Sequence, residues 1–245
     1  MSERILAVIP ARLASTRLPR KVLREIAGEP MLAWVYRAAR ACPLLDQVLI
    51  ATDSQEVLEF AQAHSLPAVF TPEDCASGTD RVYAVAQSIP ADIYVNVQGD
   101  EPLLDPAAVD AAVTSLLEDP PASIATVATP IKMPADIMDP NVVKTVLDFE
   151  GNAIYFSRAP IPWVRDTGSK VLARHLKHLG LYVFDRESLL EYPTLPPGEL
   201  ERIEQLEQLR WLENGWKIRV AEVEHDAVSV DVPEDVARVE KLLQK

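Results

Sequence analysis

The alternation of strand-like and helix-like segments across the first half of the chain is the feature that most constrains its fold. Four segments are short and apolar, as buried strands of a parallel sheet are: 4–9, 47–51, 68–70 and 92–97. Four others have helical character: 30–42, 54–64 (with Ser54 as its N-cap), 79–87 and 106–118. This alternation predicts an α/β fold with a doubly wound, mostly parallel sheet. Ligands bind beyond the carboxyl ends of the strands in such sheets, which directs attention to Arg12, Asp53 and Asp100.

The second half of the chain has a different pattern, which starts after Pro120 and Pro121. Strands are expected at 123–129, 142–148, 153–156, 178–184 and 218–223, a hairpin turn at 150–152, and helices at about 199–214 and from Pro233 onward. The sequence contains no repeat, low-complexity segment or flexible linker. We therefore predict a single domain over residues 1–245, with a mixed-sheet extension within about 121–190.

The charge and apolar content of the chain exclude several classes of protein. A formal net charge of −13 argues against general nucleic-acid binding, so a local cluster of cations is more informative than it would be in a basic chain. No apolar run is long enough for a membrane span, and the N-terminus lacks the pattern of a signal peptide. Cys42 and Cys75 form no close-spaced pair. We expect a cytoplasmic protein without membrane insertion and without a thiolate zinc site.

The segment IPARLASTRLPRK, residues 9–21, follows the first strand and carries four cations but no glycine. The absence of glycine excludes a Walker-type phosphate loop. The cations Arg12, Arg17, Arg20 and Lys21 suit a polyphosphate that is bound through charge and backbone N–H groups. A solvated basic loop explains the same residues equally well.

Two acidic motifs also follow predicted strands. Asp100 lies in VNVQGDEP, and a carboxylate at this position suits Mg²⁺, which takes one or two carboxylates together with substrate phosphates. Asp231 lies in SVDVPEDV, where it also fits the start of a helix at Pro233. Paired with Asp100, it would hold a metal ion against the phosphates of a nucleotide. The alternative for Asp100 is a polar turn that ends its strand.

The segment ASGTDR, residues 76–81, joins a glycine turn to two hydroxyls and a charged pair. It suits contacts to a base or a ribose, although Ser77 or Thr79 also suits the N-cap of the next helix.

Three further motifs occur in the second half. Arg158 suits a bidentate contact to a substrate carboxylate, whereas a lone histidine on a strand, such as His178, is more often structural. The segment LERIEQLEQLR is expected to form one amphipathic helix with an apolar stripe and a single polar edge. The stripe consists of Leu200, Ile203, Leu206 and Leu209, and the edge of Glu201, Glu204 and Gln208.

In this order, the motifs together resemble those of the 3-deoxy-manno-octulosonate cytidylyltransferases, the CMP-Kdo synthetases of Gram-negative bacteria, where Kdo is 3-deoxy-D-manno-octulosonate. The match extends from IPARLASTRLPRK to VDVPED and includes ATD, SGTDR, VNVQGDEP, YFSRAPIPW, HLGLY and LERIEQLEQLR. The resemblance implies a Rossmann-like nucleotidyltransferase fold with a smaller dimerisation extension, and hence a homodimer. It implies that CTP and Kdo react, with Mg²⁺, to give CMP-Kdo and pyrophosphate for lipopolysaccharide biosynthesis.

The resemblance also implies roles for particular residues. The nucleotide would be bound by Ala11, Arg12, Ser15, Lys21, Ser77, Gly78 and Gln98. The sugar acid would be bound by Gln98, Arg158, His178, Tyr182, Glu204 and Gln208. Asp100 and Asp231 would bind Mg²⁺, and Arg12, Lys21 and Asp100 would be the catalytic residues.

Two positions depart from the pattern of the family. Many relatives have His in place of Cys75 and Thr in place of Val232. Three alternative functions stay open: a cytidylyltransferase for a related acidic sugar (an 8-amino Kdo analogue or a sialic acid), a nucleotide-binding regulator without catalysis, and a structural dimer module. The acidic and basic residues at the predicted strand ends argue against the last two.

Overall fold

A computed structural model of the chain describes residues 3–13, 18–118, 122–165 and 174–243, and these residues divide into two units. The first unit contains Met1–Asp110, Val183–Leu190 and Ala227–Lys245. The second unit contains Ala111–Tyr182 and Glu191–Asp226.

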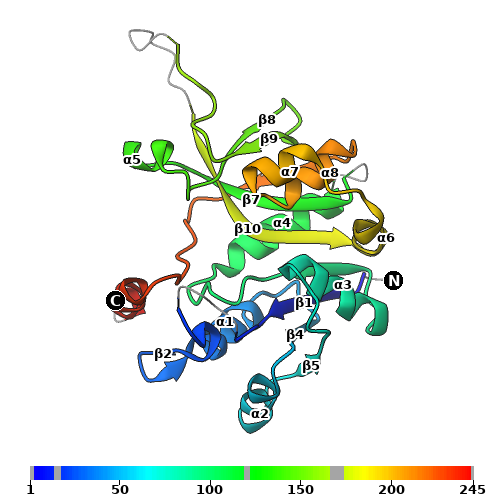
Figure 1. The fold of residues 1–245 in the computed structure, drawn as a ribbon, viewed down its shortest axis with the longest axis vertical. Helices are drawn as coiled ribbons and strands as arrows, with labels where there is room; N and C mark the ends of the chain where they lie inside the picture. The colour runs from blue at the N-terminus through cyan, green and yellow to red at the C-terminus, as the bar shows by residue number, and fades with distance from the viewer. Residues whose placement is uncertain (1–2, 14–17, 119–121, 166–173, 244–245) are drawn as a thin grey trace. The chain divides into compact units, whose positions relative to one another are not determined.

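The first unit is built on a parallel sheet with the strand order β6-β1-β4-β5. Its strands are β1 (Ile5–Pro10), β4 (Gln47–Thr52), β5 (Ala68–Phe70) and β6 (Ile93–Asn96). Its helices are α1 (Met31–Arg40), α2 (Gln55–Ala63), α3 (Gly78–Ser88), α6 (Arg186–Glu191, of which the last residue belongs to the second unit), α9 (Pro233–Leu243) and the start of α4 (Pro106–Glu118). Helices α1 and α3 pack on β1 and β4, and α2 packs on β4 and β5 (Figure 1). The predicted doubly wound α/β fold is therefore confirmed.

Strand β1 is the centre of this sheet, because it pairs with β4 on one side and with β6 on the other. Its residues Ile5–Ile9 are at most 5% exposed, as their uninterrupted apolar run predicts. The backbone continues the pairing past the strands, since Ala11 donates to the carbonyl of Ala51 at 2.8 Å and Val97 donates to that of Val8 at 2.9 Å. The residues that follow β1, β4 and β6 consequently leave the sheet at the same edge.

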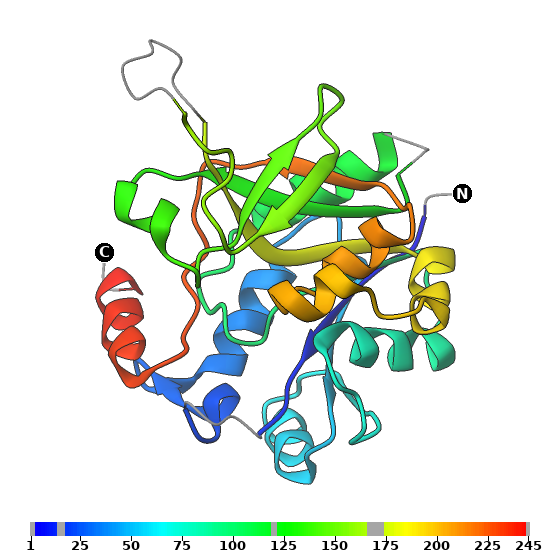
Figure 2. The same cartoon turned by 45° about the horizontal axis from the view of Figure 1, so that its top comes forward.

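Side-chain caps begin two of the helices of the first unit. The Ser54 hydroxyl accepts from the backbone of Val57, as the sequence predicts. Ser77 and Asp80 form a reciprocal capping box at the start of α3. A short hairpin of β2 (Glu25–Ile26) and β3 (Glu29–Pro30) follows the turn η1 (Lys21–Leu23). Helix α9 lies beside this hairpin, as both views show (Figures 1 and 2).

The second unit contains a mixed sheet. Its strands are β7 (Ile124–Pro130), β8 (Lys144–Leu147), β9 (Ala153–Ser157), β10 (Leu176–Asp185, of which the last three residues belong to the first unit) and β11 (Ile218–Glu222). Strand β11 is parallel to β7, whereas β8 is antiparallel to both β9 and β10. Gly151 has a φ of 86° in the predicted hairpin turn between β8 and β9 (Figure 2). The remaining elements are the end of α4, α5 (Pro134–Met138), η2 (Tyr192–Thr194), α7 (Glu199–Glu204) and α8 (Gln208–Glu213). Among the described residues, no helix combines the length and apolar character that a membrane span requires.

The predicted helix over 199–214 is wrong, because the chain forms two short helices that are separated at Gln205. Gln205 has a φ of 53°, in the left-handed region. The predicted apolar stripe is wrong as well, because Ile203 is 69% exposed whereas Leu206 is buried. The polar edge fails as well, because Gln208 is buried. At the end of the first helix, the Glu204 carboxylate accepts hydrogen bonds from Ser157 and Arg158. The periodicity of the local sequence does not reveal contacts with distant residues such as these.

We predict that Gly99→Ala lowers the free energy of unfolding. A Cβ at this position would lie 2.6 Å from the backbone oxygen of Pro10, and neither backbone can yield without disturbing the loop after β6. The expected loss is about 1–3 kcal/mol, the usual cost of overpacking, measured by urea denaturation. The matched control is Gly78→Ala, whose Cβ would lie at contact distance, 3.4 Å from the Asn96 side chain. Equal stability of the two variants would contradict the prediction.

Candidate functional site

Three residues from distant parts of the sequence meet in the first unit. The Lys21 Nζ donates to Asp100 Oδ2 at 2.5 Å and to Asp231 Oδ1 at 3.1 Å. The ammonium side chain is 15% exposed, and the two carboxylates are 25% and 32% exposed. The two carboxylates that the sequence predicts as a metal site are therefore brought together, with one cation between them.

Hydrogen bonds hold the backbone at both aspartates. Asp100 lies in the turn after β6, and its carbonyl accepts from the backbone of Val230 at 2.9 Å. Asp231 precedes α9, and its N–H donates to the Asp235 carboxylate at 2.9 Å. Val232 donates to the same carboxylate oxygen at 3.0 Å through its backbone N–H, so loss of a threonine hydroxyl here leaves the cap intact. The backbone at both aspartates is held by hydrogen bonds, whereas Lys21 reaches the carboxylates with a long and flexible side chain.

The charges of the two aspartates determine the protonation of Lys21. Burial alone would lower its pKa, but the charges and hydrogen bonds of Asp100 and then Asp231 outweigh burial and raise that pKa above its ordinary value. Lys21 is consequently a cation at neutral pH.

The donor set at this site fits a divalent cation. Two partly exposed carboxylates that already enclose a positive charge are what Mg²⁺ uses in proteins, where substrate phosphates and water complete its coordination. The described ranges contain no cluster of three or more His, Cys, Asp or Glu that could hold a metal ion. A metal held by Asp100 and Asp231 would therefore need further oxygen ligands from a bound molecule or from water.

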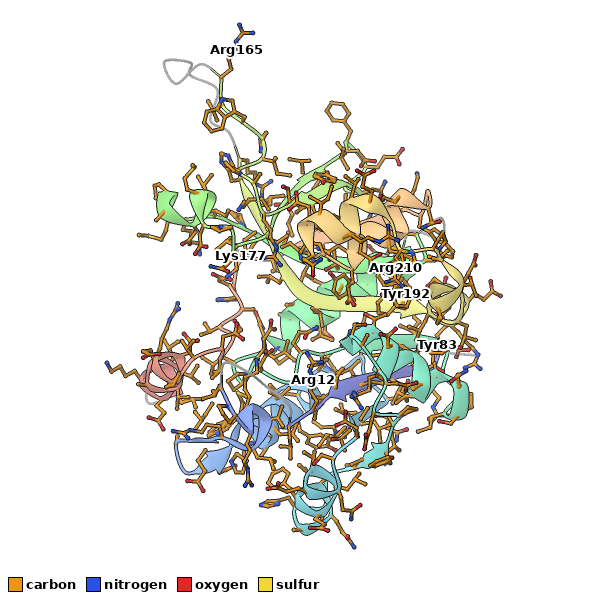
Figure 3. All side chains as sticks on the ribbon, in the orientation of Figure 1. Arg12, Tyr83, Arg165, Lys177, Tyr192 and Arg210 are labelled. Carbon is orange, nitrogen blue, oxygen red and sulfur yellow. The ribbon has the colours of Figure 1, made fainter. Side chains whose placement is uncertain are left out.

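The basic loop after β1 places its cations differently. Arg12, labelled in Figure 3, is exposed and directly follows the buried Ala11. Arg20 pairs with Glu56 on the surface, which is the solvated or structural role that its position also allows. Ser15 and Arg17 lie outside the described residues.

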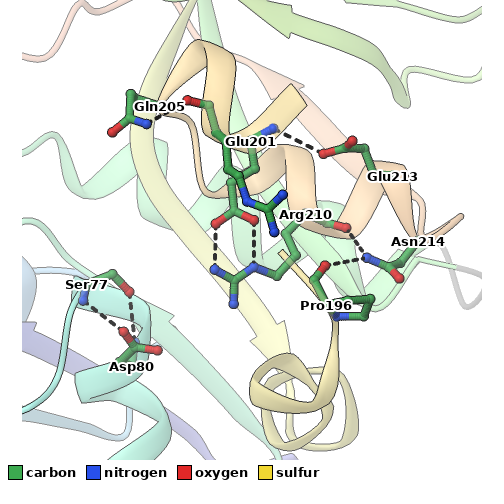
Figure 4. A network of polar contacts seen from close by, with 9 residues as sticks. Ser77, Asp80, Pro196, Glu201, Gln205, Arg210, Glu213 and Asn214 are labelled. Atoms are coloured by element: carbon green, nitrogen blue, oxygen red, sulfur yellow. Dashed lines mark hydrogen bonds and ion pairs between the residues drawn. The ribbon is translucent and has the colours of Figure 1, made fainter. Parts of the chain in front are cut away.

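The segment ASGTDR contains a helix cap and the cation of a partly buried ion pair. Ser77 donates its backbone N–H to Asp80 at 2.9 Å and accepts from the Asp80 N–H at 3.1 Å, so the capping alternative is confirmed (Figure 4). Arg81 is 2% exposed and donates to Asp53 at 2.7 Å and to Thr71 at 2.5 Å. Sequence reasoning missed this pair. In the sequence, the one indication of this ion pair is that Asp53 directly follows a strand.

In the second unit, Glu204 organises the contacts of Arg158. The Glu204 carboxylate accepts from the Ser157 hydroxyl at 2.6 Å and from the Arg158 backbone at 2.9 Å. The Arg158 guanidinium donates to the carbonyls of Glu204 at 2.7 Å and of Pro140 at 3.0 Å. These bonds fix the plane of the guanidinium and leave part of its donor capacity for a ligand.

His178 and Tyr182 lie near one another on β10. Their ring centroids are 5.4 Å apart, and the ring of Phe156 meets His178 edge-on at 4.8 Å. The His178 Nε2 lies 2.9 Å from the Thr126 hydroxyl. Burial lowers the pKa of His178 to about 3, and burial also raises the pKa of Tyr182. Both side chains are therefore uncharged at neutral pH.

The segment after the break at Gln205 contains a buried amide and an ion pair that joins the two short helices. The Gln208 Nε2 is buried and has no hydrogen-bond acceptor among the described residues, which is the condition that a ligand oxygen would relieve. Arg210 joins α8 to α7 by donating to Glu201 at 2.8 and 2.5 Å (Figure 4). The Arg210 guanidinium also lies over the Tyr192 ring, with its Cζ 4.5 Å from the ring centroid. Both residues are labelled in Figure 3. Sequence reasoning missed this contact.

Comparison with known proteins gives one consistent result. The cytidylyltransferase family profile matches residues 6–218. The chain is 59% identical over 239 residues to the 3-deoxy-manno-octulosonate cytidylyltransferase of Acidobacterium capsulatum, with 98% of this chain and 96% of the relative covered. It is 50% identical to the protein of that name from Solibacter usitatus, with 100% and 96% covered.

Solved structures agree with the sequence comparison. The structure of a CMP:2-keto-3-deoxy-manno-octonic acid synthetase complexed with CTP matches with a TM-score of 0.93 and 39% identity, and 98% of each chain is covered. A 4-diphosphocytidyl-2C-methyl-D-erythritol synthase from Anaerococcus prevotii matches with a TM-score of 0.66 and 12% identity, which shows a shared fold alone. The predicted nucleotidyltransferase fold is thereby confirmed.

We predict that His178 makes the folded state sensitive to acid. Because its pKa falls from about 6.5 in the unfolded chain to about 3 in the folded chain, its contribution is present above pH 6.5 and is lost as the pH falls below that value. The free energy of unfolding should fall more steeply in the wild type than in His178→Gln between pH 6.5 and 4, by up to about 1.4 kcal/mol per pH unit. Urea denaturation at several pH values measures both slopes. Identical slopes in the wild type and in His178→Gln would contradict the prediction.

Proposed function

Because this chain belongs to the 3-deoxy-manno-octulosonate cytidylyltransferase family, we infer that it transfers the CMP group of CTP to Kdo and releases pyrophosphate. The 59% identity over almost the whole length supports this activity, as does the likeness to a synthetase solved with CTP. The observation that carries the inference at the level of chemistry is the meeting of Lys21, Asp100 and Asp231 beyond the sheet edge. Phosphoryl transfer from a triphosphate requires cations that stabilise the negative charge of the phosphates and acidic side chains that hold a metal ion.

We assign the nucleotide to the residues that follow the strands of the first unit. The exposed Arg12 and the protonated Lys21 are the cations available to the phosphates in the described part of this loop. Ser77 and Gly78 begin α3, and the capping box fixes this end of the helix for a contact to the cytidine. Ala11 and Gln98 belong to the same assignment, as does Ser15 from outside the described residues.

The reaction is a direct displacement at phosphorus. The anomeric hydroxyl of Kdo attacks the α-phosphorus of CTP, the bond from that phosphorus to the bridging oxygen of the β-phosphate breaks, and the hydroxyl proton passes to solvent. The sugar carboxylate must approach a polyanion, and the leaving pyrophosphate gains negative charge. Arg12 and Lys21 offset this charge in the transition state, so no enzyme nucleophile is needed.

Mg²⁺ belongs to this proposal as a cofactor. Asp100 and Asp231 would hold it, and when bound it would neutralise phosphate charge and acidify the attacking hydroxyl. Asp100 and Asp231 themselves act by fixing where that positive charge is placed.

We assign the sugar acid to the second unit. Arg158 would bind its carboxylate with the guanidinium that Glu204 positions. The buried amide of Gln208 and the uncharged side chains of His178 and Tyr182 suit the hydroxyl groups of a sugar.

The biological setting is proposed on the same family relationship. A cytidylyltransferase of this kind would supply CMP-Kdo for lipopolysaccharide biosynthesis in the cytoplasm, and we expect a homodimer. Exposed apolar side chains of the second unit are compatible with a dimer interface, among them Phe149 and Ile154 on the β8–β9 hairpin. Light scattering measures the assembly, and a monomer at micromolar concentration would count against this part.

Pyrophosphate release tests the activity and the choice of sugar together. The chain is incubated with CTP, Mg²⁺ and one acceptor at a time: Kdo, its 8-amino analogue or a sialic acid. We expect the highest kcat/KM with Kdo. A higher kcat/KM with the amino analogue or the sialic acid would show that this sugar, and not Kdo, is the substrate. No pyrophosphate release with any acceptor would contradict the proposed function.

Asp100→Asn should lower kcat for pyrophosphate release by at least about a hundredfold, because the amide removes one of the two negative charges that position the metal. Asp105→Asn is the matched control. Asp105 accepts from the Ala107 backbone at 2.9 Å, and asparagine caps a helix as well as aspartate does. Circular dichroism checks that both variants fold. Near-normal turnover of Asp100→Asn would contradict the assignment of this residue.

A further inference from the structure

We propose that Lys21 is an internal counter-cation that holds Asp100 and Asp231 together in the empty enzyme and leaves them only when a triphosphate is present to accept it. A divalent cation would therefore enter with the nucleotide rather than before it. This inference rests on the proposed function, and it adds an order to the binding steps of that function.

The first support is the place of the ammonium group. The Lys21 Nζ contacts one oxygen of each carboxylate, at 2.5 and 3.1 Å, so it lies where a divalent cation held by the same two side chains would lie. All three side chains are partly shielded from water, with exposed fractions of 15%, 25% and 32%. A metal ion and this ammonium consequently cannot both occupy the position between the carboxylates.

The second support is the difference in mobility among the three groups. The Val230–Asp100 backbone hydrogen bond ties the two acidic segments together, and the Asp235 carboxylate holds the backbone at Asp231. Lys21 begins a short turn, and its side chain is the longest and most flexible of the three. The group that moves when the cation is exchanged is therefore the lysine, while the carboxylates keep their positions.

The third support is the balance of contacts in the exchange. A metal ion arriving alone would displace the ammonium into water and would gain two carboxylates, since the described residues supply no larger ligand cluster. A metal ion arriving on a triphosphate brings phosphate oxygens of its own and offers the displaced ammonium a new set of charge-assisted hydrogen bonds. The exchange is more favourable in the second case, which couples metal binding to nucleotide binding.

The test measures binding of Mn²⁺, used as a spectroscopic substitute for Mg²⁺, in the absence of nucleotide and sugar. Free Mn²⁺ is counted by electron paramagnetic resonance for the wild type, for Lys21→Met and for Arg20→Met, and Mg²⁺ is then added as a competitor. Arg20→Met is the matched control, because it removes one positive charge at the adjacent residue, which forms an ion pair with Glu56. Circular dichroism checks the folding of each variant.

Removal of the competing ammonium should tighten Mn²⁺ binding by about tenfold or more in Lys21→Met, whereas Arg20→Met should stay within about twofold of the wild type. Addition of Asp100→Asn to Lys21→Met should abolish the gain, which places the ion at these carboxylates. Lys21→Gln provides a second neutral variant for the same comparison if Lys21→Met does not fold.

Unchanged or weaker Mn²⁺ binding in the folded Lys21 variants would overturn the proposal, because the carboxylates would then need the lysine to form a site at all. An equal gain in Arg20→Met would overturn it as well, since the effect would be one of net charge alone. The measurement uses neither CTP nor Kdo, so failure of the proposed activity leaves its result readable, and the reverse is also true.

Discussion

Two carboxylates that are fixed side by side need a positive charge between them, and the chemistry of the first unit depends on how this need is met. Two like charges about 4 Å apart near a protein surface repel one another by about 4 kcal/mol. The backbone nevertheless holds Asp100 and Asp231 on one ammonium, which is contributed by Lys21. A site of this kind is already organised for a cation before any ligand arrives, and a triphosphate with its counter-ion would complete it.

The parallel sheet explains why these residues can meet. Strand β1 lies between β4 and β6, so the segments after all three strands leave the sheet at one edge. The loop after β1 brings Lys21, the turn after β6 brings Asp100, and the backbone bond from Val230 brings Asp231. The loop needs no glycine because it supplies cations to the site and does not wrap a phosphate. Gly99 is where the chain does require glycine, since the Pro10 backbone lies against it.

Much of this arrangement could be predicted from the sequence, since apolar runs and helical periodicity record which faces are buried. The strands of the first unit and the capping of α3 by Ser77 follow from such local signals. The break at Gln205 could not be predicted, because Glu204 is held by Ser157 and Arg158 from elsewhere in the chain. The ion pairs of Arg81 with Asp53, and of Lys21 with Asp100 and Asp231, could not be predicted for the same reason. Periodicity describes one element at a time, whereas these contacts join elements.

Anomalous diffraction from crystals of the chain grown with Mn²⁺ and CTP tests directly whether the metal replaces the Lys21 ammonium between Asp100 and Asp231. We expect an anomalous peak within coordination distance of both Asp100 and Asp231, with the Lys21 ammonium moved from between them onto the phosphates. Crystals grown with Mn²⁺ alone should keep the ammonium in place and show little or no peak there. A peak at another position, or an ammonium that stays between the carboxylates when Mn²⁺ and CTP are both bound, would contradict the proposed exchange of the two cations.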